Sequence, residues 1–291
     1  MTDPCRLRDL RELMSRYGFR TDKAKGQNFL IDPTVPERIA ALACRPDVGV
    51  LEIGPGVGSL TQRLCASADH VLAIEKDKSL SPLLGETMAD FDNLTILYTD
   101  ALKVDYPTLL AEYFPGRDCI VCANLPYYIT TPILTALLEA ECFQSVTVMV
   151  QKEVAQRISA LPGTAEYGAF SVFCQYYAQP EYRFDVLPES FFPQPKVTSG
   201  VLTLRIRTEP PCQMLDKAMF FRTVRAAFAQ RRKTLVNSLT TLFSLPKERL
   251  TFLVTECGLP ADIRGERLSL ADFALLSDAL LRELSQQKNQ A

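Results

Sequence analysis

A short polar segment with a proline, Asn124-Leu125-Pro126-Tyr127, follows an apolar run at 118–123 that predicts a buried strand. Such a segment could act on the exocyclic amine of adenine. That amine is a poor nucleophile because its lone pair is delocalised into the ring. Two acceptors aimed at its protons, the Asn124 side-chain oxygen and the carbonyl of Leu125 or Pro126, would localise that lone pair. Tyr127 could stack on the base, a contact worth about 1–3 kcal/mol. The alternative interpretation is a plain turn with a packed tyrosine.

A glycine-rich segment follows the apolar run 48–53. Gly54 and Gly56 would let the backbone turn tightly and come close to a bound nucleoside. With Gly58 they form G-x-G-x-G instead of the G-x-G-x-x-G that is typical of dinucleotide sites. The spacing therefore disfavours a pyrophosphate cofactor, although a simple strand-to-helix turn stays open as an alternative.

Acidic residues stand at the ends of the next two predicted strands. Glu75 lies 21 residues after Gly54 and could accept both hydroxyls of a ribose. Asp100 is placed to accept a hydrogen bond from an adenine amine. Because the carboxyl ends of parallel strands meet at one edge of a sheet, these residues predict a nucleoside cofactor site there.

Predicted strands and helices alternate along the part of the chain that would position these residues. Helical spacing after apolar runs favours an α/β fold, a Rossmann-like and mostly parallel sheet with helices on both faces. After residue 208 the pattern is helical almost to the end, so we predict an α/β domain at 1–208 and a small all-helical domain at 209–291. Strands are expected at 48–53, 71–75, 94–98, 118–123, 145–150, 182–187 and 197–206, helices at 6–17, 34–44, 130–140 and 170–177, and an irregular loop at 21–32.

The bulk composition is that of a globular protein of 291 residues, with 47% hydrophobic and 23% charged residues. No apolar run reaches the 18 residues of a membrane-spanning helix, and the N-terminal residues do not resemble a signal peptide. We therefore expect a cytoplasmic monomer. Cys119 and Cys122 form a C-x-x-C inside an apolar run, and His70 is the single histidine. Buried, reduced thiols are expected, and no metal site.

Charge is distributed unevenly along the chain. Residues 191–250 hold eleven Lys and Arg against three Asp and Glu, a net charge of +8, although the whole chain carries −2. Such a segment is typical of a surface that faces a polyanion, although a solvated helix face would have the same composition. The candidates for phosphate contacts are Arg222, Arg225, Arg231, Arg232 and Lys233.

From about residue 23 to residue 281 the sequence resembles the ribosomal RNA adenine dimethyltransferases, and among them the small-subunit (16S) type. Co-occurrence of the family's motifs in one order makes the resemblance specific. They stand here as KAKGQNFLID (23–32), LEIGPGVGSLT (51–61), AIEKD (73–77), TDAL (99–102), NLPYYITTPIL (124–134), FFPQPKVTS (191–199) and AFAQRRKTLVNSL (227–239).

The resemblance implies S-adenosyl-L-methionine as the cofactor and assigns roles to individual positions. Asn28 and Leu30 match positions that close over the methionine part of the cofactor. Phe191 matches an aromatic that covers the target base opposite Tyr127, while Phe192 occupies a variable place; either phenylalanine could instead belong to the core. The implied cofactor-binding set is Asn28, Leu30, Gly54, Gly56, Glu75, Lys76, Asp100, Ala101 and Asn124, and the implied catalytic set is Asn124, Leu125, Pro126, Tyr127 and Phe191.

The activity that the resemblance implies is dimethylation of the N6 amines of two adjacent adenines in a 3′-terminal hairpin of 16S rRNA. The partner would be 16S rRNA in the small subunit or its precursor, with a role in ribosome biogenesis. Three alternatives stay open: a large-subunit (23S) rRNA methyltransferase, a ribosome-assembly factor without catalysis, and a DNA adenine methyltransferase.

Overall fold

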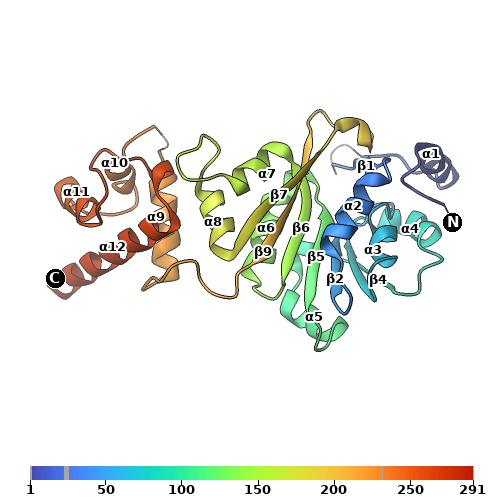
Figure 1. Cartoon of the computed structure of the whole chain (residues 1–291), viewed down its shortest axis with the longest axis horizontal. Coiled ribbons are helices and arrows are strands. Elements are labelled where there is room, and N and C mark those ends of the chain that lie inside the picture. The colour runs from blue at the N-terminus through green and yellow to red at the C-terminus, as the bar shows by residue number, and fades with distance from the viewer. Residues whose placement is uncertain (1, 23–25, 231, 291) are drawn as a thin grey trace. The chain divides into compact units, whose positions relative to one another are not determined.

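The computed structural model describes residues 2–22, 26–230 and 232–290 (Figure 1). Contacts between residues divide the chain into two compact units. The first, here the sheet unit, contains Met1–Ala155 and Gln179–Ile206. The second, here the helical unit, contains Gln156–Ala178 and Arg207–Ala291.

A seven-stranded sheet forms the centre of the sheet unit, with strand order β4-β3-β2-β5-β6-β9-β7. Neighbouring strands from β4 to β6 pair in parallel, and β9 runs antiparallel to β6. The chain order reverses between β2 and β5, and ligands of open α/β sheets bind at such a switch point. The strands are β2 (Gly49–Ile53), β3 (Val71–Glu75), β4 (Leu94–Tyr98), β5 (Cys119–Asn124), β6 (Ser145–Gln151), β7 (Ala178–Val186) and β9 (Ser199–Ile206).

Helices flank this sheet, and the central strands are buried on both faces (Figure 1). Burial on both faces explains why the sequences of these strands are continuous apolar runs and do not alternate between apolar and polar residues. The predicted mostly parallel α/β fold is confirmed. The helices are α1 (Leu7–Arg16), α2 (Thr34–Ala43), α3 (Thr61–Cys65), α4 (Ser81–Thr87), α5 (Tyr106–Tyr113), α6 (Thr130–Glu139) and α7 (Lys152–Ser159).

The predicted irregular loop at 21–32 contains a short strand, β1 (Phe29–Leu30). It pairs antiparallel with β8 (Phe191–Phe192), so that Leu30 lies opposite Phe191. Two residues are too few for a recognisable period, and their partner is more than 150 residues away in the chain. The strand therefore exists only because the tertiary fold brings the two segments together.

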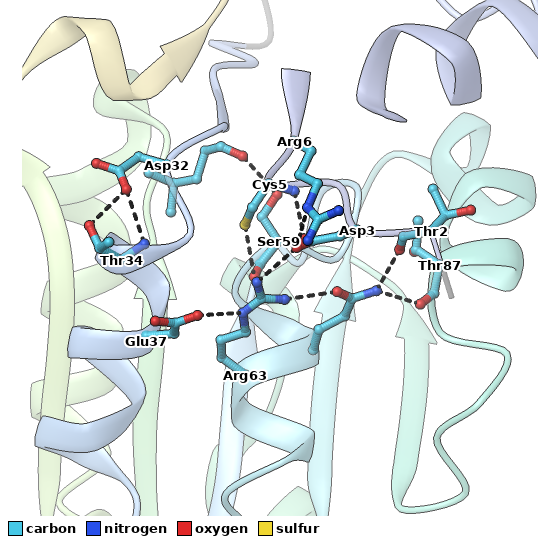
Figure 2. Close-up of polar contacts among 12 residues, drawn as sticks. Thr2, Asp3, Cys5, Arg6, Asp32, Thr34, Glu37, Ser59, Arg63 and Thr87 are labelled. Carbon is cyan, nitrogen blue, oxygen red and sulfur yellow. Dashed lines mark hydrogen bonds and ion pairs between the residues drawn. The ribbon is translucent and has the colours of Figure 1, made fainter. Parts of the chain in front are cut away.

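Polar contacts around Arg63 hold the start of the chain against α3 (Figure 2). The Arg63 guanidinium lies 3.1 Å from the Asp3 carboxylate and 3.8 Å from that of Glu37. In the turn just before α3, the Ser59 hydroxyl donates a hydrogen bond of 3.1 Å to the Leu30 carbonyl. The N-terminal segment and β1 are thus both fixed to the residues that follow the glycine segment.

The helical unit contains α8 (Ala169–Tyr177), α9 (Lys217–Phe228), α10 (Leu235–Leu239), α11 (Lys247–Glu256) and α12 (Leu270–Gln290). Aromatic rings pack between these helices: the Tyr176 ring centroid lies 5.4 Å from that of Phe220, which lies 6.4 Å from that of Phe273. This packing explains why 156–178 joins the helical unit although sheet strands follow it in the chain. No helix in the described ranges is long and apolar enough to cross a membrane.

Candidate functional site

A cavity of about 470 Å³ opens in the sheet unit at the carboxyl ends of β2, β3, β4 and β5. Strand ends meet there because the strands are parallel, as the sequence pattern predicts. Every residue that was predicted to bind the cofactor or to act in catalysis lines this cavity. They are Asn28, Leu30, Gly54, Gly56, Glu75, Lys76, Asp100, Ala101, Asn124, Leu125, Pro126, Tyr127 and Phe191.

The glycine segment has the backbone conformation that its composition predicts. Gly54 has φ of 72° and Gly56 has φ of 62°, in the left-handed region that side chains disfavour. A Cβ atom at Gly54 would meet no atom within 4 Å, which leaves the backbone accessible to a ligand. A Cβ atom at Gly56 would come within 3.2 Å of the Phe29 ring, so this glycine also permits close packing of β1.

Glu75, the last residue of β3, is held by two backbone amides. Gly56 N donates to Glu75 Oε2 at 3.2 Å, and Asp77 N donates to Oε1 at 2.7 Å. Burial raises the pKa of this carboxyl, and the hydrogen bonds oppose the rise. The side chain is thus fixed in place before any ligand binds, and each oxygen keeps lone pairs for further donors.

Asp100 forms an ion pair with Lys76, the residue after Glu75. Lys76 Nζ lies 2.9 Å from Asp100 Oδ2, and Leu102 N donates to Oδ1 at 3.1 Å. Lys76 is the main cause of a pKa of Asp100 below its usual value. Both side chains are partly exposed, so solvent screens the pair and it contributes little to stability. A ligand amine could therefore compete with Lys76 for the Asp100 oxygens.

The two carbonyls that could act beside Asn124 differ in whether they already accept hydrogen bonds within the chain. The Pro126 carbonyl accepts hydrogen bonds from Ile129 N at 3.2 Å and from the Thr130 hydroxyl at 3.1 Å. Within the described ranges, no donor reaches the Leu125 carbonyl or the Asn124 side chain. The free acceptors at the end of β5 are therefore the Asn124 side-chain oxygen and the Leu125 carbonyl.

Two of the aromatic residues that line the cavity, Tyr127 and Phe191, come from elements distant in the chain. Tyr127 is half-buried, and its hydroxyl lies 2.7 Å from Ser199 Oγ. Phe191 is only 3% exposed and lines the cavity, whereas Phe192 does not line it. The Arg11 guanidinium lies 5.2 Å from the centroid of the Phe192 ring instead. Successive residues of a strand point to opposite faces, which separates the environments of the two phenylalanines.

Several lining residues were not predicted from the sequence, among them Glu52, Gln27 and Tyr128. Glu52 is 1% exposed, burial raises its pKa to about 8, and its Oε2 has no hydrogen-bond partner among the described residues. Gln27 donates to Asp77 Oδ2 at 3.0 Å, which ties the loop before β1 to the end of β3. Tyr128 is 59% exposed at the same cavity. A carboxyl inside an otherwise apolar strand was a signal for Glu52, and GQNFL was one for Gln27.

The predicted RNA-binding residues belong to the helical unit and differ in their contacts. Arg225, Arg232 and Lys233 are exposed, and Arg231 lies outside the described residues. Arg222 donates a hydrogen bond of 2.7 Å to the carbonyl of residue 242, and its guanidinium lies 4.7 Å from the centroid of the ring at position 243. Arg222 therefore has a packing role within the unit that the other described candidates lack.

All nine cysteines are free thiols, and Cys119 and Cys122 are buried in β5. Within the residues that the structure describes, no group of His, Cys, Asp and Glu is arranged to hold a metal ion.

Comparison with known proteins extends over most of the chain. The family model described as ribosomal RNA adenine dimethylase matches residues 18–280. The ribosomal RNA small subunit methyltransferase A of Bacillus cytotoxicus is 46% identical over 277 residues, which cover 93% of this chain and 95% of that protein. Its counterpart in Lachnoclostridium phytofermentans is 46% identical over 274 residues, or 92% and 94% of the two chains.

Two solved structures have the same fold. The 23S rRNA methyltransferase ErmE aligns with a TM-score of 0.66 and 28% identity over 87% of this chain and 99% of that chain. A dimethyladenosine transferase from Plasmodium falciparum aligns with a TM-score of 0.70 and 24% identity over 89% and 98% of the two chains.

Proposed function

The chain belongs to the ribosomal RNA adenine dimethylase family, and from this membership we propose that it dimethylates the N6 amines of two adjacent adenines in a 3′-terminal hairpin of 16S rRNA. The relatives with 46% identity carry the name of small-subunit enzymes, and this likeness is the observation that supports the small-subunit target. The partner would be 16S rRNA in the small subunit or its precursor, and the reaction would be a step of small-subunit biogenesis. We also propose that the protein acts as a cytoplasmic monomer.

Enzymes of this family use S-adenosyl-L-methionine, and the charges of the cavity fit that cofactor. The lining carries the carboxyls of Glu75, Asp77 and Asp100, the protonated carboxyl of Glu52 and the ammonium of Lys76. One of these carboxyls, that of Glu52, is buried with an unpartnered oxygen. A ligand with a sulfonium and an ammonium group would complement this excess of carboxyls. Bound there, the cofactor supplies an electrophilic methyl group.

In the proposed mechanism, Glu75 accepts hydrogen bonds from the ribose hydroxyls, and Asp100 accepts one from the adenine amine of the cofactor. The Gly54 and Gly56 backbone lies against the cofactor, and Asn28 and Leu30 close over its methionine part. The role of Glu75 as acceptor for the ribose hydroxyls is supported by the two backbone amides that hold its carboxyl in place. Orientation of this kind is a main contribution of a protein to a transfer in which the cofactor provides the reactive group.

The target amine would be held by the two free acceptors at the end of β5. The Asn124 side-chain oxygen and the Leu125 carbonyl accept its two protons, which localises the lone pair on nitrogen. The Pro126 carbonyl is the weaker candidate because Ile129 and Thr130 already donate to it. The amine loses a proton after it has been alkylated, so the chain needs no general base for the attack.

The target base would be stacked between Tyr127 and Phe191, which line the cavity from the 3-10 turn after β5 and from β8. The base has to leave its own stack, which costs a few kcal/mol and less in a loop. Stacking on aromatic rings, at about 1–3 kcal/mol per base, offsets that cost.

The experiment that tests the function is methyl transfer from labelled S-adenosylmethionine to unmethylated small subunits, followed by nucleoside analysis. We expect N6,N6-dimethyladenosine in 16S rRNA and no label in naked 23S rRNA. Label in 23S rRNA or in DNA alone would instead support one of the alternative activities.

Asn124→Ala should abolish methyl transfer while small-subunit binding persists. Loss of one preorganised polar group at a reacting centre typically costs about a hundredfold to a thousandfold in rate. Binding and turnover are measured separately, by sedimentation with subunits and by label incorporation. Methylation that persists in this variant would show that the catalytic assignment is wrong, and loss of both properties would point to a structural defect.

A further inference from the structure

Ser199 is a buried polar residue that contacts the cavity-lining Tyr127 and belongs neither to the cavity lining nor to the predicted site set. Its side chain is fully buried, and its Oγ lies 2.7 Å from the Tyr127 hydroxyl oxygen. Within the described ranges this is the only side-chain hydrogen bond of either residue. Each hydroxyl thus depends on the other for a partner, and a buried hydroxyl without a partner costs about 1–3 kcal/mol.

The backbone at Ser199 is held firmly by the sheet. Ser199 is the first residue of β9 and lies opposite Gln151 of β6, while Lys152 N donates to the Thr198 carbonyl at 3.0 Å. Strand β6 in turn pairs with β5, which ends at Asn124. Ser199 and Asn124 are therefore fixed by the same hydrogen-bonded strands.

Tyr127 has a less constrained position. It begins a single turn of 3-10 helix, Tyr127–Ile129, directly after Pro126, and its ring is half-buried at the cavity. A half-buried ring keeps freedom about its side-chain torsions, and this freedom must be lost before a base can stack on it. A hydrogen bond at the far end of the ring removes that freedom before the substrate arrives.

We propose that Ser199 is a positioning residue of the methyl transfer, which holds the Tyr127 ring in the orientation that receives the target adenine. The inference rests on the proposed function, because it assumes that Tyr127 stacks on that base. Ser199 acts only through the Tyr127 hydroxyl and touches neither the cofactor nor the target base.

A double-mutant cycle tests this role with Ser199→Ala, Tyr127→Phe and the combined variant. Tyr127→Phe keeps the ring and removes only the hydroxyl. A net hydrogen bond typically corresponds to about a threefold to tenfold change in rate. We expect each single variant to lower kcat on small subunits by that factor and to leave the KM for S-adenosylmethionine unchanged. The combined variant should lose no more than either single variant, because both changes break the same contact.

The matched control is Thr147→Val in the same sheet. The fully buried Thr147 of β6 has its hydroxyl 3.2 Å from that of Thr203 in β9, and neither residue lines the cavity. Thr147→Val should lower the thermal midpoint as Ser199→Ala does while kcat stays at the wild-type value. A fall in kcat of the same size in the control would mean that Ser199 has only a structural role.

Other outcomes also contradict the inference. Unchanged kcat in both single variants, a loss in only one of them, or losses that multiply in the combined variant would each exclude action through the Tyr127 hydroxyl. If Ser199→Ala does not fold, kcat of Tyr127→Phe tests the inference by itself, because this variant removes the other hydroxyl of the same contact. An unchanged kcat in Tyr127→Phe would then contradict the inference. Wild-type protein that fails to methylate small subunits would contradict the proposed function and not this inference.

Discussion

At the scale of single residues, the site is defined by which polar atoms already have a partner. Both oxygens of Glu75 accept hydrogen bonds from backbone amides. One oxygen of Asp100 accepts a hydrogen bond from a backbone amide, and the other forms an ion pair with Lys76. The Asn124 side chain has none among the described residues, and Glu52 has an unpartnered oxygen. Atoms with partners are fixed in position, and atoms without partners are available to a ligand, because burial of an unsatisfied polar atom is costly.

Glu52 should make the stability of the free protein depend on pH. Burial raises its pKa from 4.5 to about 8, so the folded state keeps a proton that the unfolded chain releases. The stability that the neutral carboxyl contributes is fully present below pH 4.5 and is lost as the pH rises through about 8. Glu52→Gln should therefore flatten the fall in urea midpoint between pH 4.5 and about 8, the interval between the two pKa values. Parallel pH profiles for wild type and variant would contradict the assignment.

The pair Phe191 and Phe192 provides a matched test of base stacking. Phe191→Leu keeps an apolar side chain in the cavity wall but removes the ring, so kcat/KM for small subunits should fall about fivefold to a hundredfold. Phe192→Leu removes a ring that lies outside the cavity, so its kcat/KM should equal that of wild type. Equal losses in the two variants would exclude Phe191 as the stacking residue.

At the scale of elements, the site depends on short segments that the large sheet holds in place. Strand β1 has two residues and forms a two-stranded sheet with β8, yet these strands carry Leu30 and Phe191 to the cavity. The loop before β1 is tied to the end of β3 by Gln27 and Asp77. Contacts of this kind, and not helix or strand propensity, fix the loop over the cavity.

Gln27→Ala should weaken cofactor binding specifically. The Gln27 amide donates to Asp77 Oδ2 at 3.0 Å and accepts from Asp22 N at 2.8 Å, so its loss removes two contacts at the loop before β1. We expect the KM for S-adenosylmethionine to rise about threefold to tenfold with kcat nearly unchanged. Steady-state kinetics at saturating small subunits measure both constants. Gln144→Ala is the control, because Gln144 is bonded to Arg45 away from the cavity, and a similar rise there would contradict the prediction.

At the scale of the whole molecule, chemistry and RNA affinity are expected to reside in different units. The cavity lies wholly in the sheet unit, whereas the described basic candidates Arg225, Arg232 and Lys233 belong to the helical unit. Phosphate contacts give affinity and position without sequence information. The assignment of RNA binding to the helical unit is a proposal that salt dependence can test.

Replacement of Arg225, Arg232 and Lys233 by Gln should weaken small-subunit binding. The slope of log K against log salt concentration should become shallower by about 2–3, because each lost phosphate contact removes about 0.7–0.9. Arg222→Gln is the control: it loses a hydrogen bond and a ring contact, so the thermal midpoint should fall and the slope should change less. An unchanged slope in the triple variant would place the phosphate contacts elsewhere.

The sequence by itself determined the fold class and most of the site. Runs of five to seven largely apolar residues mark the parallel strands, and the candidate site residues stand at the ends of those strands. Parallel strands bring their ends to one edge whatever the details of packing, which is why Gly54, Glu75, Asp100 and Asn124 could be placed together in advance.

Only the tertiary structure decided the contacts between segments that are distant in the chain. The pairing of β1 with β8 and the bond between Tyr127 and Ser199 join residues 72 or more positions apart. The tertiary structure also placed Phe191 in the cavity lining and Phe192 outside it. The structure also distinguished the free Leu125 carbonyl from the occupied Pro126 carbonyl. Local periodicity carries no information about such partners, because packing of the whole unit determines which hydrogen-bonding groups meet.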